Sequence, residues 1–284
     1  MQLRAVAVQD ISCVGRCSLT VALPILSAAG VNTAVVPTAL LSTHTGEFTG
    51  YTHLDLSGEL LPIARHLSTL GLRFDAFYSG YLASGAQAET VAEMMDLLCG
   101  EGTHIFVDPA FGDHGHLYSL LDASLPAAMR RLCARARTVT PNLTEAAFLL
   151  EEPFPGEEAG EACVSRLCRG LRALGVDNVV ITDVAARPGF TGAAVLAKGM
   201  DAPAFLYRER FPGVFHGTGD VFASFLLGAL MRGAALVRAA ELALEMTHLA
   251  IRRTLEGGEP LRYGLRFEDV LPAYWRRLTD AWPG

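Results

Sequence analysis

Residues 215–228 read FHGTGDVFASFLLG, a glycine-rich turn that leads directly into an apolar helix. Gly217 and Gly219 allow the backbone to point its N–H groups outward, and the start of a helix adds a positive dipole. This combination predicts an anion hole, and Asp220 in the first helical turn is placed to accept a proton beside it. The same residues also suit a plain turn with Asp220 as a helix cap, so the neighbouring segments must decide.

The segments upstream of this helix alternate between short apolar or β-branched runs and longer helical patterns. That alternation is typical of a parallel sheet covered by helices on both faces and built from right-handed crossovers. One helical pattern, for example, occupies residues 91–98 and stops at Gly100. The predicted strands are residues 5–8, 33–37, 76–79, 105–108, 138–140 and 179–182.

The pattern changes after residue 182. Residues 190–196 and 204–207 are extended runs separated by turn residues, and they predict antiparallel strands at one edge of the sheet. Because no linker or composition break divides the chain, we expect one domain over residues 1–284. The predicted fold class is α/β, a three-layer α/β/α arrangement around a mostly parallel sheet. Helical patterns return at residues 218–231, 234–254 and 267–279.

The composition excludes several classes of protein. Of the 284 residues, 51% are hydrophobic and 19% are charged, which suits a soluble enzyme with a large core. A net charge of −7 without a dense basic stripe argues against nucleic acid as a partner. We expect a cytoplasmic protein, because no signal peptide pattern is present and the longest apolar stretch, residues 221–237, contains Arg232. Six scattered cysteines predict neither a disulfide framework nor a zinc site.

Polar clusters follow the predicted strands, at the ends where a shared site would form. In an open α/β sheet, ligands bind in the crevice outside the carboxyl ends of the strands. We therefore expect these clusters to line one site. They are residues 9–12, 42–45, 79–81, 108–109 and 141–142.

Four segments, taken in order, carry a resemblance to a known family. They read SGYL at residues 79–82, followed by Gln87, then DPAFGD at 108–113, TPNLTEA at 140–146 and GTGD at 217–220. This order resembles the ribokinase-like kinases and, within them, the pyridoxal/pyridoxamine (vitamin B6) kinases, from residue 6 to about residue 254. The resemblance implies a ribokinase-like fold and ATP-dependent phosphorylation of the 5′-hydroxymethyl group of a B6 vitamer. It also implies Mg²⁺, a monovalent cation such as K⁺, and a homodimer.

For the glycine-rich turn, the resemblance implies that Asp220 is the base for the 5′-hydroxyl group. The amides of Gly217, Thr218 and Gly219 would then stabilise the transferring phosphoryl group. A protein of another class, which only binds or carries a vitamer, would have lost Asp220, and Asp220 is present.

On the nucleotide side, the resemblance implies a polar cluster that orders metal ions and water around the ATP phosphates, with Asp108 and Glu145 next to the metal. The alternative for Asp108 is a turn before Pro109, and for Asn142 with Glu145 a helical capping box. Capping and ligand binding are compatible for Asn142. The residues implied on this side are Asp108, Asp113, Thr140, Asn142, Glu145 and Thr182.

On the vitamer side, Tyr81 resembles the family residue that packs near the pyridine ring, and His44 with Thr45 resembles the loop that meets the ring substituents. The alternative for Tyr81 is an interior aromatic residue whose hydroxyl group has found a partner. The alternative for His44 is a satisfied structural histidine.

Asp10 is a departure from the family pattern, because many B6 kinases place a serine there to meet the pyridine nitrogen. A carboxylate would instead pair with a protonated ring nitrogen, and Ser12 is the other candidate for the serine's role. Asp10 also keeps a rival open, the hydroxymethylpyrimidine kinases of thiamine synthesis. Those enzymes usually have a cysteine at the position of Asp220 and a glycine cluster after the first strand, so we place them second and a sugar kinase third.

Overall fold

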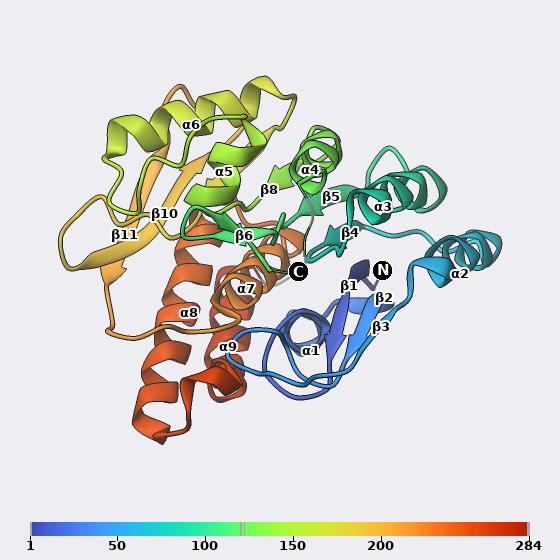
Figure 1. The fold of residues 1–284 in the computed structure, drawn as a ribbon, viewed down its shortest axis with the longest axis horizontal. Coiled ribbons are helices and arrows are strands. Elements are labelled where there is room, and N and C mark those ends of the chain that lie inside the picture. The colour runs from blue at the N-terminus through green and yellow to red at the C-terminus, as the bar shows by residue number, and fades with distance from the viewer. Residues whose placement is uncertain (1, 120, 122, 283–284) are drawn as a thin grey trace.

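The computed structural model describes residues 2–119, 121 and 123–282, which form a layered α/β fold (Figure 1). Nine strands make one sheet in the spatial order β11-β10-β9-β8-β5-β4-β1-β2-β3. A separate short hairpin pairs β6 (Gly112–Asp113) with β7 (His116–Leu117). The strands of the large sheet are β1 (Arg4–Ser12), β2 (Asn32–Leu41), β3 (His53–Asp55), β4 (Ala76–Ser79), β5 (His104–Val107), β8 (Thr138–Val139), β9 (Asn178–Ile181), β10 (Phe190–Leu196) and β11 (Ala204–Glu209).

The centre of the sheet is parallel. Strands β2, β1, β4, β5, β8 and β9 pair in parallel in that order. β10 and β11 add in antiparallel fashion at one edge, which confirms the edge predicted from residues 190–196 and 204–207. β3 adds antiparallel to β2 at the other edge. The sequence did not predict β3, because its three exposed residues are too few to show a strand period.

Helices cover both faces of the sheet, as the alternation predicted (Figure 1). Each layer packs its apolar side chains against its own face, and the three-layer α/β/α fold class is thereby confirmed. One layer contains α1 (Leu19–Ala28), α7 (Thr218–Met231), α8 (Leu236–Gly257) and α9 (Leu271–Ala281). The other contains α2 (Ser57–Thr69), α3 (Gly85–Leu98), α4 (Leu125–Cys133), α5 (Leu143–Leu149) and α6 (Glu161–Ala173).

The C-terminal region corrects one prediction. The expected helix over residues 267–279 consists of two elements, the 3₁₀ turn η2 (Phe267–Val270) and then α9. Pro272 lies in the first turn of α9, where its missing N–H costs nothing, so a new helix begins there. A further 3₁₀ turn, η1 (Leu261–Tyr263), follows α8. Among the described residues, no helix has both the length and the apolar character needed to cross a membrane.

Strand β1 shows how the fold brings polar residues to one edge. Val6 and Val8 are fully buried in one half of the core, and Ala5 and Ala7 are fully buried in the other. This two-sided burial explains the continuous apolar run at the start of the strand. The register with β2 shifts at the polar end of the strand, where Asp10 follows Gln9. The strand therefore delivers its carboxylate at the carboxyl edge of the sheet.

Candidate active site

The turn before α7 is held in place by a close backbone contact. Gly217 is the N-cap residue of α7 and has φ of 73°. A side-chain carbon at Gly217 would collide with the carbonyl oxygen of Arg16, so this contact requires glycine. Thr218 stabilises the turn by donating a hydrogen bond from Oγ1 to the Phe215 carbonyl at 2.8 Å. Gly219 is exposed, with open space where a Cβ would be, so this side of the turn is accessible.

Asp220 lies in the first turn of α7, and its carboxylate is held from outside this helix. The backbone N–H of Ser18 donates a hydrogen bond to it. Burial raises the pKa of Asp220 to about 7; the Ser18 bond opposes this rise and the charge of Asp10 adds to it. Because Gly217 is the N-cap residue, the alternative role of Asp220 as a helix cap is excluded. A carboxylate with a pKa near neutrality suits a general base.

Asp10 is the second carboxylate of the site. Burial raises the pKa of Asp10, and hydrogen bonds from the side chains of Ser18 and Ser12, with the charge of His53, oppose this rise. Ser12 donates from Oγ to Oδ2 of Asp10 at 3.4 Å. Ser18 thus contacts both carboxylates, Asp10 through its side chain and Asp220 through its backbone. The predicted acceptor-side residue and the predicted base are therefore neighbours.

Tyr81 comes from the loop after β4 and lies on the Asp10 side of the site. Burial raises the pKa of Tyr81 to about 12, and the charges of Asp10 and Tyr51 add to this rise. Thr38 Oγ1 donates a hydrogen bond to the Tyr81 carbonyl at 3.4 Å and ties this loop to β2. Tyr81 is partly exposed, so it is not the interior aromatic residue of the alternative interpretation.

His44 is a buried histidine whose two ring nitrogens are both engaged by backbone groups. Nε2 donates to the carbonyl oxygen of Arg262 at 2.5 Å, and Nδ1 accepts from the N–H of Gly46 at 3.1 Å. Burial lowers the pKa of His44, so the neutral ring that this arrangement needs is favoured. This is the structural role that the sequence left open. The adjacent Thr45 is exposed on the same loop.

Asn142 and Glu145 form the predicted capping box at the start of α5, and the same pair holds the β6 strand. Asn142 Oδ1 accepts from the Glu145 N–H at 2.9 Å, and Glu145 Oε2 accepts from the Asn142 N–H at 3.0 Å. Glu145 Oε1 also accepts from the N–H groups of Phe111 at 2.8 Å and Gly112 at 3.3 Å. Burial raises the pKa of Glu145 to about 7 against these three backbone bonds.

Asp108 links the two sides of the site. Thr140 Oγ1 donates a hydrogen bond to Asp108 Oδ1 at 3.0 Å. Burial raises the pKa of Asp108 well above its ordinary value, and the charges of Glu145 and Asp220 add to the rise. The carboxyl groups of Asp108, Glu145 and Asp220 therefore lie near one another where the strand ends meet, and burial favours the protonated form of each.

Asp113 and Thr182 lie at the margin of this cluster. The charge of Asp113 adds to the raised pKa of both Glu145 and Asp183. Thr182, directly after β9, donates its backbone N–H to the Pro141 carbonyl at 2.9 Å. The structure thus places both residues at the same end of the sheet as Asp108.

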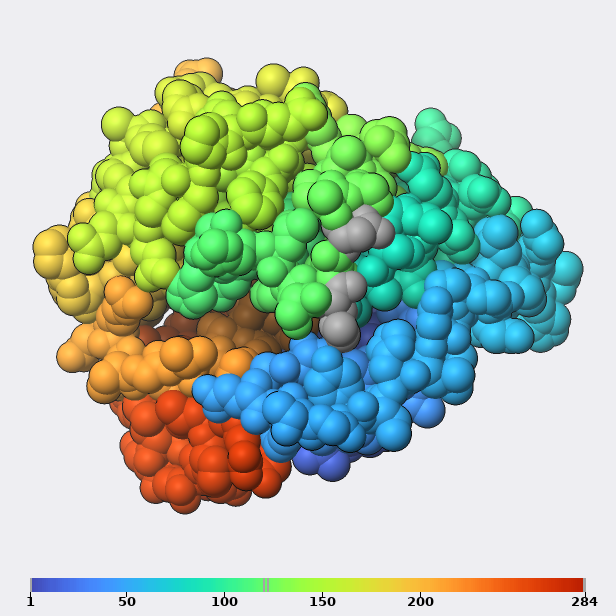
Figure 2. Space-filling model, in the orientation of Figure 1, coloured from blue at the N-terminus to red at the C-terminus, as the bar shows by residue number. Residues whose placement is uncertain are grey.

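The space-filling view shows a hollow at this end of the molecule (Figure 2). It opens between the green segment around the β6–β7 hairpin and the orange segment that leads into α7. The predicted nucleotide-side residues come from the strands and loops beside the green segment. The hollow therefore lies beside the segments that carry the predicted nucleotide-side residues and the glycine-rich turn.

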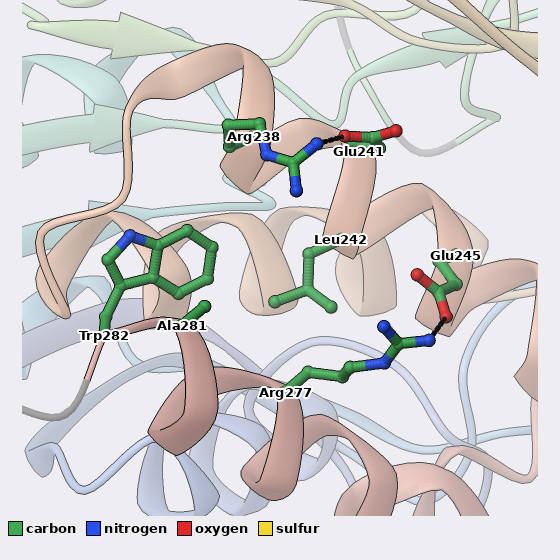
Figure 3. A pocket seen from close by; sticks show the side chains of 7 residues that line it. All are labelled: Arg238, Glu241, Leu242, Glu245, Arg277, Ala281 and Trp282. Atoms are coloured by element: carbon green, nitrogen blue, oxygen red, sulfur yellow. Dashed lines mark hydrogen bonds and ion pairs between the residues drawn. The ribbon is translucent and has the colours of Figure 1, made fainter.

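A different pocket of about 230 Å³ lies between α8 and α9 (Figure 3). Its charged side chains form pairs, Arg238 with Glu241 at 2.5 Å and Arg277 with Glu245 at 2.8 Å. Arg238, Glu241 and Glu245 belong to the first half of α8, and Arg277 belongs to α9. Helix α8 begins after the end of α7 that is remote from Asp220. This pocket is therefore separate from the candidate active site.

Comparison with known proteins matches this arrangement to a family of kinases. The sequence profile of the phosphomethylpyrimidine kinase family matches residues 23–262. The chain belongs to this family. The pyridoxine/pyridoxal/pyridoxamine kinase of Bordetella avium is 30% identical to this kinase over 250 residues, which cover 83% of this chain and 80% of that protein.

Solved structures extend this kinase's likeness over the whole fold. A Bacteroides thetaiotaomicron protein named as a phosphomethylpyrimidine kinase, crystallised with pyridoxal, has a TM-score of 0.91 and 34% identity, covering 96% of both chains. The pyridoxal kinase of Lactobacillus plantarum has a TM-score of 0.88 and 31% identity, covering 99% of both chains. The predicted resemblance to vitamin B6 kinases of ribokinase-like fold is confirmed.

Sequence reasoning missed several residues of this kinase's site. Ser18 holds both carboxylates, and Arg16 supports Gly217 through its carbonyl oxygen. Tyr51 neighbours Tyr81, and His53 neighbours Asp10. Ser18 directly precedes a helical segment, and this N-cap position was the only local signal; the other contacts join segments far apart in the chain.

Proposed function

We propose that the chain transfers the γ-phosphoryl group of ATP to the 5′-hydroxymethyl group of pyridoxal, pyridoxamine or pyridoxine. The observation that carries this proposal is the Asp220 carboxylate, whose pKa is raised to about 7, at the start of the helix that follows Gly217 and Gly219. Pyridoxal kinases are among the similar proteins with identity of 30% or more, which supports a B6 vitamer as the acceptor. We treat residues 1–284 as one kinase domain.

In the proposed step, Asp220 accepts the proton of the 5′-hydroxyl group while the alcohol oxygen attacks the γ-phosphorus. An O–P bond forms to the vitamer, and the bond from the γ-phosphorus to the bridging oxygen breaks, so ADP leaves with the electron pair. The backbone amides of Gly217, Thr218 and Gly219 would hold the equatorial oxygens during the transfer. A base with a pKa near the working pH combines the right protonation state with a useful driving force.

The nucleotide side would be formed by Asp108, Thr140 and Thr182 from the strand ends, with Asn142 and Glu145 holding the β6 hairpin against the phosphates. Asp113 would border the same group.

Mg²⁺ fits this side for a chemical reason. Burial raises the pKa of both Asp108 and Glu145, and the charge of Glu145 adds to the rise at Asp108, so a divalent cation nearby would favour the ionised form of these carboxyl groups. Glu145 already accepts backbone hydrogen bonds at both oxygens, so it would act through ordered water. Within the described ranges, no group of three or more His, Cys, Asp or Glu side chains is arranged to hold a metal, which suits an ion carried mainly by phosphates and water. When bound, Mg²⁺ neutralises phosphate charge. We also propose that K⁺ binds near the same cluster.

On the vitamer side, Tyr81 and Thr45 would approach the pyridine ring, with His44 fixing the loop that carries Thr45. We propose that Asp10 pairs with the protonated ring nitrogen, a charge-assisted contact. Ser12 donates its hydroxyl hydrogen to Asp10, which favours Asp10 over Ser12 as the partner of that nitrogen. Replacing Asp10 by Asn should raise the KM for pyridoxal and alter its pH dependence; an unchanged KM across pH would remove Asp10 from this role.

The proposed assembly is a cytoplasmic homodimer. Large apolar side chains are exposed on α1, β2 and β3, and Leu54 of β3 is 57% exposed. Leu23 of α1 and both Val35 and Leu40 of β2 are also exposed. If these side chains form one contiguous surface, that surface would be the dimer interface. Sedimentation of the wild type and of Leu54→Asp tests this assignment, because the variant should be monomeric if the face is used.

A coupled ATP-consumption assay with four acceptors tests the function. The acceptors are pyridoxal, pyridoxamine, pyridoxine and hydroxymethylpyrimidine, each with and without Mg²⁺ and with K⁺ or Na⁺. Turnover with the vitamers and little with hydroxymethylpyrimidine supports the proposal. The family name and Asp10 favour hydroxymethylpyrimidine as the second candidate, and turnover with that acceptor alone would replace the first.

A further inference from the structure

His216 directly precedes the glycine-rich turn, and its ring lies under a different loop. Residues 42–50, which follow β2, are named here the acceptor loop. Gly46 of this loop covers the His216 ring so closely that a side-chain carbon there would lie 2.6 Å from Nδ1 and 2.7 Å from Cε1. Glu47 of the same loop places Oε1 3.7 Å from His216 Nε2. The ring thus fills the space between the acceptor loop and the turn.

His44 completes the contact from the acceptor-loop side. The rings of His44 and His216 have centroids 5.2 Å apart at an interplanar angle of 38°. His44 cannot move independently, because its nitrogens are bonded to Arg262 and Gly46. Phe48 packs against the His44 ring edge at a centroid distance of 4.9 Å. The acceptor loop therefore presents a fixed surface to His216.

The other side of the turn is equally fixed. Arg16 donates its backbone N–H to the Tyr263 carbonyl at 3.0 Å, and its side chain forms an ion pair with Glu268 at 2.8 Å. The carbonyl oxygen of Arg16 is the group that Gly217 approaches. Gly217 thus packs against the backbone of Arg16, while its neighbour His216 packs against the acceptor loop. Among these contacts, only those of His216 join the acceptor loop directly to the segment that carries the anion hole.

We propose that His216 is a positioning residue that couples the acceptor loop to the anion hole of residues 217–219, so that vitamer binding and phosphoryl stabilisation depend on one another. This inference rests on the proposed function. His216 acts through Gly46 on the loop proposed to meet the vitamer and through the backbone on Gly217. Displacing a bound group by about 1 Å can lower the rate on the order of 100-fold. Loss of the contact between His216 and the acceptor loop should therefore lower kcat.

The surroundings of His216 indicate that its ring acts by packing and not by forming an ion pair. Glu47 is the acidic group that faces Nε2, and its side chain is 55% exposed. At 3.7 Å and with this exposure, the pair contributes little by itself. The packing of Gly46 on the ring is the stronger contact, and it needs the flat, rigid shape of an aromatic side chain. A ring of similar shape should therefore preserve more of the coupling than a small side chain.

Steady-state kinetics of His216→Ala and His216→Phe test this inference, with ATP and pyridoxal varied separately. For His216→Ala we expect kcat to fall about 10- to 100-fold and the KM for pyridoxal to rise about fivefold, while the KM for ATP changes less than twofold. His216→Phe keeps a ring under Gly46 and should recover most of both losses. A purely structural role would lower the active fraction, and with it kcat, but would leave both KM values unchanged.

His104→Ala is the matched control. His104 is another partly buried histidine, at the start of β5, where Nε2 contacts Thr138 Oγ1 at 2.9 Å. This variant should lose folding stability without a rise in the KM for pyridoxal. If His216→Ala matches it in both respects, the inference is overturned. If the wild type phosphorylates no vitamer, the proposed function fails first, and that outcome is distinct from an active wild type with kinetically normal His216 variants.

Discussion

The backbone N–H of Ser18 donates a hydrogen bond to the carboxylate of Asp220. The Ser18 side chain bonds Asp10 at the same time, so one residue holds both carboxylates of the site. Ser18 is the N-cap residue of α1 and adopts φ of 50° and ψ of −131°, which non-glycine residues rarely occupy. Strained backbone of this kind is typical of functional sites, where the surrounding structure enforces it. Burial raises the proton affinity of Asp220 and the Ser18 bond opposes that rise, and the next two predictions follow from the net shift.

The first prediction concerns the pH dependence of kcat/KM for pyridoxal. Asp220 acts as a base only when deprotonated, so activity should rise with pH through about 7, the pKa to which burial raises this carboxyl. The charge of Asp10 adds to that rise, so Asp10→Asn should move the acid limb to lower pH. Asp96→Asn, on the surface of α3, is the control and should leave the limb in place. If the acid limb does not move in Asp10→Asn, the charge of Asp10 does not influence the pKa of Asp220.

The second prediction concerns the stability of Asp220→Asn. The pKa of Asp220 rises from 3.8 to about 7 on folding, so the folded state holds its proton more tightly. The stability from this carboxyl is complete below pH 3.8 and is lost as pH rises to about 7. Asn stays neutral throughout, so the variant should exceed the wild type by roughly 1–3 kcal/mol at pH 8 and by less at pH 5. Urea unfolding at both pH values measures the difference in stability. Equal stability of the two proteins at pH 8 would contradict the claim that folding buries the charge of Asp220.

The third prediction compares two glycines of the same turn. Gly217→Ala places a carbon against the carbonyl oxygen of Arg16 at φ of 73°, so it should destabilise the fold by about 1–3 kcal/mol. Gly219→Ala meets open space and should leave the melting temperature nearly unchanged. It should still lower kcat, because its methyl group narrows the proposed anion hole. Calorimetry and turnover of both variants test this contrast, and a kcat at the wild-type level in Gly219→Ala would remove Gly219 from the hole.

The fourth prediction concerns Glu145→Gln. The carboxylate accepts backbone N–H groups at both oxygens, whereas an amide offers one oxygen and turns an NH₂ group toward a donor. The variant should lose about 1–3 kcal/mol of stability and show a raised KM for ATP, because the β6 hairpin loses its anchor. Glu151→Gln, at a surface ion pair with Arg130, serves as the control. A normal KM for ATP would mean that the hairpin does not shape the nucleotide site.

Much of the fold could be predicted because its signals are local. The alternation of apolar runs and helical patterns reports the parallel sheet, since strands such as β1 are buried on both faces. The capping box of Asn142 and Glu145 could be predicted because its two residues are three positions apart in the sequence. β3 and the division between η2 and α9 were missed, because short elements at edges and ends take their form from tertiary packing.

The candidate site was predictable as a set of residue types, but its connections were not. Asp10, Tyr81, Asp108 and Asp220 could be singled out because each follows a predicted strand or opens a helix, and the family resemblance implied their roles. The roles of Ser18 and His216 depend on contacts between segments that are far apart in the sequence. No local spacing of residues predicts these contacts. Burial also decides the proton affinities, and burial belongs to the folded protein.

The central claim is that Asp220 is the base for phosphoryl transfer to a B6 vitamer. Its most direct test is a rapid-quench measurement of pyridoxal 5′-phosphate formed from pyridoxal and MgATP by the wild type and by Asp220→Asn. The account predicts product from the wild type and a rate about 10²- to 10⁴-fold lower in the variant, with ATP binding nearly intact. Product formed by Asp220→Asn at close to the wild-type rate would contradict it.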